Sequence, residues 1–218
     1  QRTALARAIA KDAKAIFLDE PLANLDYKLR EELRDQLPDI LGQRGTVVVY
    51  ATSEPSEALL LGGRTALVHE GTIAQTGPTS EIYRRPADLT SARVFSDPPI
   101  NFATVEKASG QITLGDATWP ASGAASELAD GPYTLGLRPH HVLPTQTTAN
   151  TVPVSGRVAI TELSGSESVA HFELGDQTWV SQSPGVHPYE VGEMHDFHLL
   201  PDRCLYFEPN GGALVAGG

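Results

Sequence analysis

Two continuous apolar runs constrain the fold of this chain most strongly. Residues 15–18 form the first run, which ends abruptly at Asp19, and residues 46–50 form the second, which is rich in β-branched side chains. Runs without polar alternation are typical of strands buried on both faces of a parallel sheet. A helical pattern over residues 27–37 separates them. The strand–helix–strand order therefore predicts an α/β layer with parallel strands.

Flanking patterns extend this layer. Residues 1–10 are rich in Ala and Arg and read as a helix, and a short helix is expected at residues 55–61. Asp26 can cap the helix at residues 27–37, and Pro38 is expected to end or kink it.

The pattern changes beyond about residue 65. A β-hairpin is expected around Glu70-Gly71, with short helical turns at residues 79–83 and 93–95. Short strands punctuated by Gly, Pro, Asn and Asp then follow, which predicts a small all-β barrel or sandwich. We place the domain boundary near Pro98, giving domains 1–98 and 99–218, and find no internal repeat strong enough to claim. The expected strands are 112–114, 133–137, 154–160, 169–174, 177–180 and 196–199.

Composition excludes some classes of protein. The formal net charge is -11 and the sequence pI is near 5.0, so nucleic-acid binding through phosphate contacts is disfavoured. Cys204 is the single cysteine, so no intrachain disulfide can form. No stretch approaches the roughly 18 apolar residues of a membrane helix, and no secretory signal is present. Because Gln1 starts inside an expected helix without an initiator Met, we expect a fragment, a processed product or an excised part of a longer protein.

Asp19 and Glu20 are the first candidates for chemistry. They follow a buried strand, at the sheet edge where open α/β folds bind ligands. An Asp there can hold Mg²⁺ on a nucleotide, and an adjacent Glu can orient or deprotonate water. For an isolated Asp-Glu pair, a solvated strand end or a helix cap is the more common explanation.

The surrounding sequence favours the chemical interpretation. Residues 1–10, the run Ala15-Ile16-Phe17-Leu18-Asp19-Glu20-Pro21 and Leu22-Ala23-Asn24-Leu25-Asp26 occur in unbroken order. This order resembles the segment that follows the signature motif of ABC-transporter ATPases. The resemblance implies a partial P-loop NTPase layer. Asp19 would be the Walker B aspartate that binds Mg²⁺ through the nucleotide, Glu20 the catalytic glutamate, and Asp26 the D-loop residue that contacts a partner subunit.

Two pieces of that family's site are absent from the sequence. No G-x-x-x-x-G-K-[ST] phosphate loop occurs, and the Leu-Ser-Gly-Gly-Gln signature is missing too. Residues 163–166 mimic the signature but lie among short strands, and we interpret them as a turn. We therefore expect no tight ATP binding by this chain alone.

Ser53 is a third departure. The family usually carries Thr-His-Asp after the second strand, where this chain has Thr52-Ser53-Glu54. A serine hydroxyl is shorter than an imidazole and cannot become a cation near neutral pH. The site could be degenerate and pair with an intact ATPase subunit, or Ser53 could keep a weaker contact in a slow site. We favour the first.

The C-terminal half carries a second resemblance. Residues 136–142, Gly-Leu-Arg-Pro-His-His-Val, are similar to the Gly-Leu/Ile-Arg-Pro-Glu-His motif of sugar-importer ATPases, with His140 in place of the usual glutamate. Residues 200–207 and, more loosely, residues 161–167 resemble other segments of the same domain. Together they suggest the transport-associated OB domain of maltose- and glycerol-phosphate-type importers, so the expected fold class is α/β plus an all-β OB-type barrel.

These resemblances imply a function. The intact protein would use ATP and Mg²⁺ to drive a membrane permease for a sugar or related solute. It would pair with a second ATPase subunit in a homo- or heterodimer, act indirectly with a periplasmic solute-binding protein, and lie in the cytoplasm on the inner face of the membrane. The alternative is a non-catalytic regulatory or dimerisation module.

Three other features have competing explanations. His140-His141 could suggest a metal, but no other ligands occur at recognisable spacing, so a metal site is disfavoured. Trp119 and Trp179 could form a stacking platform, although core packing is favoured. Without a phosphate-loop strand, the parallel sheet is expected to have an exposed edge and uncovered apolar faces, causing association or partial disorder before about residue 65.

Overall fold

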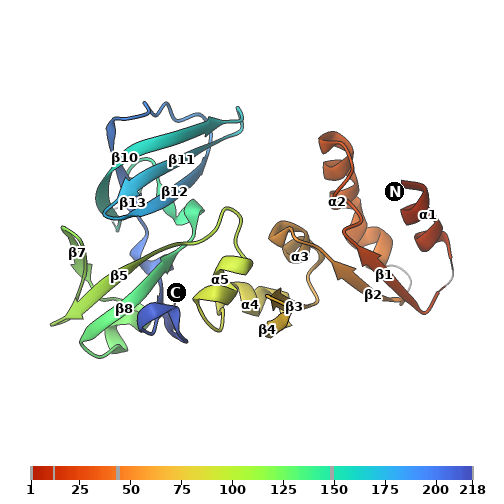
Figure 1. Ribbon diagram of the computed structural model, residues 1–218, viewed down its shortest axis with the longest axis horizontal. Helices are drawn as coiled ribbons and strands as arrows, with labels where there is room; N and C mark the ends of the chain where they lie inside the picture. Colours follow the sequence, from red (N-terminus) through yellow and green to blue (C-terminus); the bar gives the residue numbers. More distant parts are fainter. Residues whose placement is uncertain (1, 12, 43–44, 148–149, 218) are drawn as a thin grey trace. The chain divides into compact units, whose positions relative to one another are not determined.

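The computed structural model describes residues 2–11, 13–42, 45–147 and 150–217 (Figure 1). The chain divides into two compact units. Unit 1 comprises residues 1–65 and 77–80, and unit 2 comprises residues 66–76 and 81–218. The division into domains 1–98 and 99–218 stays a prediction, because compactness alone does not define a domain's ancestry. In the part of the chain that the structure describes, no helix is long and apolar enough to cross a membrane.

Unit 1 contains the predicted α/β layer. Strand β1 pairs in parallel with β2, with Ala15 opposite Val47 and Asp19 opposite Ala51. Leu5, Leu22 and Leu37 form the core with the inward residues of β1. The parallel strand–helix–strand prediction is therefore confirmed. The elements are α1 (Arg2–Ala10), β1 (Ala15–Asp19), α2 (Tyr27–Gly42), β2 (Val47–Ala51) and α3 (Pro55–Leu61).

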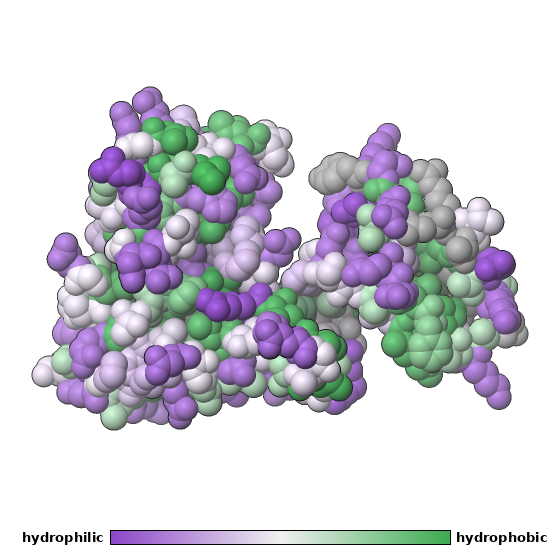
Figure 2. Space-filling model, viewed as in Figure 1, coloured by the Kyte–Doolittle hydropathy of each residue, from purple (hydrophilic) through white to green (hydrophobic). Residues whose placement is uncertain are grey.

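The expectation that both strands are buried on both faces is wrong. Ile16 and Leu18 are buried, but Phe17 is 76% exposed, Val47 64% and Val49 48%. Side chains alternate across a strand, so these three belong to the face opposite the unit's core. Figure 2 shows hydrophobic surface on unit 1 in green. An apolar face is thus left uncovered within unit 1.

Pro38 lies inside α2, which continues to Gly42. Proline removes one backbone donor from a helix but leaves the following turn free to form its own bonds. The expected helix end at Pro38 is therefore corrected.

The hairpin predicted around Glu70-Gly71 is confirmed between β3 (Arg64–His69) and β4 (Thr72–Pro78). Both turn residues have positive φ, 48° and 76°, as a two-residue type I′ turn requires. Helices α4 (Thr79–Arg84) and α5 (Leu89–Val94) follow, and the Asp88 carboxylate caps α5 by accepting a 2.7 Å hydrogen bond from the Ser91 amide.

The rest of unit 2 is mostly β and barrel-like, consistent with the predicted OB-type domain. One sheet has the strand order β15-β14-β8-β5-β6-β7 and the other has β12-β11-β10-β13-β9. The strands and 3-10 helices are β5 (Asn101–Ala108), β6 (Gln111–Leu114), β7 (Ala117–Pro120), η1 (Gly123–Glu127), β8 (Gly131–Leu137), η2 (Pro139–His141), β9 (Val142–Leu143), β10 (Val152–Leu163), β11 (Glu167–Leu174), β12 (Gln177–Pro184), β13 (Met194–Leu199), η3 (Pro201–Arg203), β14 (Leu205–Phe207), η4 (Pro209–Gly211) and β15 (Leu214–Gly217).

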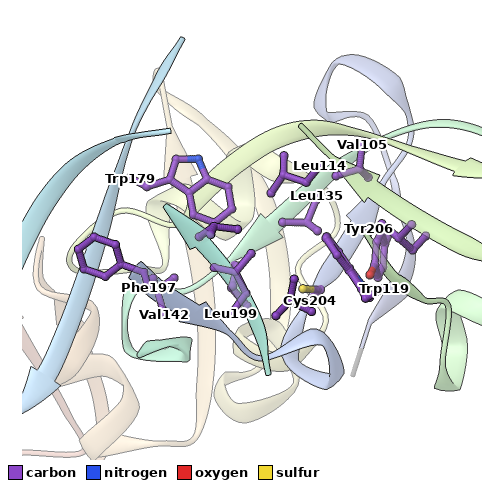
Figure 3. Packing of buried hydrophobic residues seen from close by; sticks show 14 of the residues in the cluster. Val105, Leu114, Trp119, Leu135, Val142, Trp179, Phe197, Leu199, Cys204 and Tyr206 are labelled. Carbon is purple, nitrogen blue, oxygen red and sulfur yellow. The ribbon is translucent and has the colours of Figure 1, made fainter. Parts of the chain in front are cut away.

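A single core joins the two sheets. It includes Trp119 and Trp179, which are only 4% and 0% exposed, so the core interpretation of both tryptophans is confirmed. Figure 3 shows Leu135 and Leu199 among the side chains between the two indoles in that view. Residues 164–166 connect β10 to β11, which confirms the predicted turn there.

Unit 2 also contains an internal repeat, which corrects the sequence-based conclusion that none could be claimed. Residues 114–119 read Leu-Gly-Asp-Ala-Thr-Trp, and residues 174–179 read Leu-Gly-Asp-Gln-Thr-Trp. Each segment closes a two-residue hairpin, β6–β7 and β11–β12, with Gly115 at φ 56° and Gly175 at φ 63°. The two segments therefore share five of six residues, a glycine of positive φ in the turn and a buried tryptophan.

The repeat extends to the strands that follow. Strand β8 leads into η2 and β9, as β13 leads into η3 and β14. Each short last strand then pairs with the other repeat: β9 with β13, where His198 faces Leu143, and β14 with β8, where Gly136 faces Leu205. Strands β5 and β10 correspond as the antiparallel partners of β8 and β13. Unit 2 is thus built from two related strand sets that exchange their last strands.

Candidate functional site at the carboxyl ends of β1 and β2

The parallel register of β1 and β2 brings the predicted site residues to one edge of the sheet. Asp19 ends β1 opposite Ala51, the last residue of β2. The Glu20 amide donates a 2.9 Å hydrogen bond to the Ala51 carbonyl, which extends the pairing one residue further. Asp19 and Glu20 therefore lie beside the turn at residues 52–54, as the carboxyl ends of adjacent parallel strands require.

Glu20 has an unusual backbone. Its φ is 42°, in the left-handed region that side chains other than Gly rarely adopt. The Ala23 amide bonds to the Glu20 carbonyl at 3.3 Å, so the residue starts a tight turn directly after the strand. Strained residues cluster at functional sites, and an outlier of this kind is a reason to propose a function for Glu20.

Ser53 occupies the tip of the turn after β2. The Glu54 amide donates a 3.0 Å hydrogen bond to the Thr52 hydroxyl, which closes the turn, and Ser53 is exposed. The structure thus places Ser53 near the same edge as Asp19 and Glu20, with its short side chain open to solvent.

Asp26 is held at the start of α2. Its carboxylate accepts a 3.1 Å hydrogen bond from the Leu29 amide, which confirms the predicted capping. The residue is exposed, and the turn that leads to it starts at Glu20. It remains accessible to a second molecule.

Arg30 is a residue of this site that the sequence analysis missed. Its guanidinium forms a 3.1 Å ion pair with Glu54 and lies 3.3 Å from the Ala23 carbonyl and 3.4 Å from the Leu25 carbonyl. It therefore ties the turn before α2 to the turn after β2. Its position one helical turn after the capping Asp26 was the sequence feature that could have indicated its proximity to this turn.

Tyr50 anchors the far side of the same turn. Its hydroxyl donates a 2.9 Å hydrogen bond to Glu57, which is only 3% exposed on α3. Burial first, and then this carboxylate, raise the pKa of Tyr50, so the phenol stays protonated as a donor. The contact fixes α3 against β2 and leaves Ser53 between two anchored segments.

The residues present fit part of a magnesium–nucleotide site. Asp19 is an exposed carboxylate at a strand end, and carboxylate oxygens are the protein ligands that Mg²⁺ prefers. A nucleotide's phosphates also need a cradle of backbone amides, which the sequence lacks because it has no phosphate loop. The edge can hold a cation and position water, but it does not enclose a triphosphate by itself.

The Gly-Leu-Arg-Pro motif of the C-terminal half has a structural role in unit 2. Arg138 is 4% exposed and donates hydrogen bonds of 2.9 Å to the Phe95 carbonyl and 2.7 Å to the Tyr83 carbonyl. Its guanidinium also lies 3.7 Å from the centroid of the Tyr83 ring. Burial lowers the pKa of Arg138 from its usual value. The motif's arginine therefore clamps the α4–α5 segment onto β8.

The two motif histidines pack against each other, with His140 exposed and His141 half-buried. Their ring centroids are 4.2 Å apart, and the buried Nδ1 of His141 lacks a hydrogen-bond partner among the described residues. Burial lowers the pKa of His141 to about 3 and also lowers that of His140. Both rings are therefore neutral at neutral pH.

Comparison with known proteins agrees with these motifs. Residues 135–207 match the TOBE domain family. The chain is 34% identical over 218 residues to the sn-glycerol-3-phosphate import ATP-binding protein UgpC of Ruegeria sp. (strain TM1040), a match that covers 99% of this chain and 60% of that protein. It is 35% identical over 219 residues to the xylose/arabinose import ATP-binding protein XacK of Haloferax volcanii, covering 97% of this chain and 57% of that protein.

A third relative is the uncharacterized ABC transporter ATP-binding protein YcjV of Escherichia coli O157:H7, 28% identical over 95% of this chain and 59% of that protein. The chain thus spans about 60% of the length of the curated relatives it matches. The resemblance to ATP-binding subunits of sugar and glycerol-phosphate importers is confirmed.

Proposed function

Because the chain matches ABC-importer ATP-binding subunits over nearly its whole length, we propose that it is part of the energy-coupling subunit of an importer for sugars or related solutes. The observation that carries the proposal is the shared edge of β1 and β2. It joins the Asp19-Glu20 pair to the turn at Ser53, the two segments that ATP chemistry would need from this part of the protein.

Each residue at the edge has a proposed task. Asp19 would hold the Mg²⁺ of a bound nucleotide, and such a cation would supply positive charge to the phosphate oxygens. Glu20, fixed by its turn, orients the attacking water and accepts its proton. Asp26 contacts a second ATPase subunit, and Arg30 keeps the two turns in register.

Ser53 limits the ATPase activity that we expect from the site. An imidazole at this position could carry positive charge toward the terminal phosphate, whereas the exposed Ser53 hydroxyl cannot and reaches less far. We propose a degenerate site that works beside an intact ATPase subunit in a heterodimer. The second reading is a slow site in which Ser53 keeps a weaker polar contact.

The proposed partners follow from the same assignment. They are membrane permease subunits and a second ATPase subunit, with a periplasmic solute-binding protein acting indirectly, and the protein would lie on the inner face of the membrane. Nucleic acid is not proposed as a partner, because the net charge of -11 opposes phosphate contacts.

Mg²⁺-dependent ATP binding tests the proposal. We expect this chain alone to bind MgATP no tighter than about 1 mM, since the phosphate cradle lies outside it. The longer protein should bind MgATP, and Asp19→Asn should weaken the Mg²⁺-dependent part of the binding at least about tenfold. Asp39→Asn, an exposed aspartate on α2, is the control that should leave binding unchanged. Micromolar binding by this chain, or equal binding by Asp19→Asn, would overturn the assignment.

The alternative is a non-catalytic regulatory or dimerisation module, favoured by the uncovered apolar face at Phe17, Val47 and Val49. Large exposed apolar patches mark interaction sites. Small-angle scattering of this chain distinguishes the two: a concentration-dependent dimer, together with a longer protein that binds no nucleotide, would favour this alternative.

A further inference from the structure

Unit 2 contains a cleft of about 970 Å³, within the range that small-molecule sites usually have. The segments that line it form corresponding pairs, one member of each pair from each internal repeat. Residues 102–104 of β5 correspond to residues 153–155 of β10, and the hairpin turn 114–117 corresponds to 174–177. All four segments line the cleft, so it lies where the two repeats meet.

Corresponding positions of the two repeats carry the same kinds of polar group in the cleft. Asp116 and Asp176 occupy the same position of the two Leu-Gly-Asp turns, and the hydroxyls of Thr104 and Ser155 occupy the same position of β5 and β10. The Ser155 hydroxyl donates to Asp196, which leaves its oxygen able to accept. Each repeat thus contributes one carboxylate and one hydroxyl to the cleft.

Residues outside the repeats close the cleft on one side. Arg93 of α5 stacks on Phe102, with its guanidinium carbon 4.0 Å from the ring centroid. Asn210 and Gly211 come from η4, which is held by a 3.1 Å hydrogen bond from the Gly211 amide to the Thr134 hydroxyl. A cation, an aromatic face and an amide therefore join the paired carboxylates and hydroxyls.

Several of these polar side chains are uncommitted. Asp116, Asp176, Gln177 and Asn210 make no side-chain hydrogen bond or ion pair with any other residue that the structure describes. The turns that carry Asp116, Asp176 and Gln177 are held by the flanking strand pairs, and Asn210 lies in η4, where the Gly211 amide bonds to the Glu208 carbonyl. Their polar ends are therefore available to a ligand. Because the cleft offers both hydrogen-bond donors and acceptors, we expect a ligand that both donates and accepts hydrogen bonds.

The charged and metal-ligating side chains of the cleft limit the class of molecule that it can bind. Two carboxylates against one guanidinium disfavour phosphate or sulfate, and the whole chain is acidic. The described residues hold no group of three or more His, Cys, Asp or Glu side chains that could bind a metal ion. Vicinal hydroxyls both donate to carboxylates and accept from amides and guanidinium groups, and C–H faces pack on an aromatic ring.

We propose that this cleft binds an uncharged polyhydroxylated small molecule, a sugar or a polyol. The ligand sits between the two Leu-Gly-Asp turns, which bond its hydroxyls, and against the Arg93–Phe102 stack. The proposal is independent of the ATPase assignment, because every lining residue belongs to unit 2.

Titration of the full chain with xylitol, D-xylose and maltose tests the proposal. The sequence has two tryptophans, Trp119 and Trp179, each at the end of one Leu-Gly-Asp-x-Thr-Trp segment, so intrinsic fluorescence reports on each turn when Trp119→Phe and Trp179→Phe are compared. Calorimetry gives the affinity. We expect saturable binding of at least one of these probes at or below about 10 mM.

Variants assign the binding to the cleft. The double variant Asp116→Asn/Asp176→Asn should weaken binding at least about tenfold, and Gln177→Leu should weaken it independently. Glu190→Gln removes one exposed carboxylate outside the cleft and should leave binding unchanged. Inorganic phosphate, MgCl₂ and putrescine are the charged probes.

Three results would overturn the proposal. The first is that none of the uncharged probes binds up to about 10 mM. The second is that only phosphate, Mg²⁺ or putrescine binds. The third is that Gln177→Leu and the double variant, folded by circular dichroism, bind as tightly as the unmodified chain.

Discussion

The clamp formed by Arg138 gives the sharpest stability prediction. Arg138→Met keeps much of the buried aliphatic volume but removes both hydrogen bonds to the Phe95 and Tyr83 carbonyls and the stacking on the Tyr83 ring. Hydrogen bonds from a charged group contribute about 1.5–3 kcal/mol each, and removal leaves two acceptors without this donor. The cost of burying the guanidinium, which lowers the pKa of Arg138, offsets part of this. We expect a net loss of about 3 kcal/mol in the free energy of unfolding of unit 2.

Urea unfolding followed by tryptophan fluorescence measures this loss, because both tryptophans of the chain lie in the core of unit 2. Arg138→Lys should lose about 2 kcal/mol, since an ammonium cannot span both carbonyls as a planar guanidinium does. Arg157→Met is the control: Arg157 is exposed and bonds one carbonyl, so its loss should stay within about 0.5 kcal/mol. If Arg138→Met costs less than about 1 kcal/mol, the clamp does not stabilise the fold and the reasoning is refuted.

Four further predictions test other parts of the structure. Gly156→Ala should destabilise unit 2 by about 1–3 kcal/mol in urea unfolding, because its Cβ would lie 2.4 Å from the Phe172 ring and 2.7 Å from a backbone oxygen. The pKa of His141 is lowered to about 3, so the unfolded state binds more protons than the folded state between pH 6.5 and 3. The stability that is present above pH 6.5 is therefore lost as the pH falls. Discounted for partial exposure, about 1 kcal/mol of the free energy of unfolding should be lost between pH 7.5 and 5, and His141→Gln should abolish that loss. Asp26→Ala should cost unit 1 about 1 kcal/mol, measured by circular dichroism, and an unchanged midpoint would contradict the cap. Phe17→Asp should reduce any self-association seen in sedimentation, whereas an unchanged mass distribution would show that this face is not the contact.

The α/β elements of unit 1 could be predicted because their signals are local. Apolar runs, a capping aspartate and parallel order sufficed to place β1, β2 and the edge that joins Asp19 to the turn at Ser53. The apolar run alone predicted a buried Phe17, whereas the absence of a phosphate-loop strand predicted uncovered apolar faces, and the 76% exposure of Phe17 agrees with the second expectation. Arg30 was missed because its partners lie in two turns that meet only in space.

The repeat in unit 2 shows a different limit of sequence analysis. Five of the six residues around each Gly-Asp turn match, but the strands on either side share little sequence, and the loops between corresponding strands differ in length. Strand exchange between β9 and β14 is a long-range pairing, which no local pattern encodes. The cleft therefore became visible only when the two turns were placed together.

ATP turnover of the longer protein with Ser53 and with Ser53→His tests the central functional claim most directly. In the proposed site the carboxylates of this edge are competent and Ser53 limits the rate. We expect at least about tenfold faster MgATP hydrolysis by Ser53→His, and loss of that gain when Glu20→Gln is added. Unchanged turnover in Ser53→His, or a gain that survives Glu20→Gln, would contradict it.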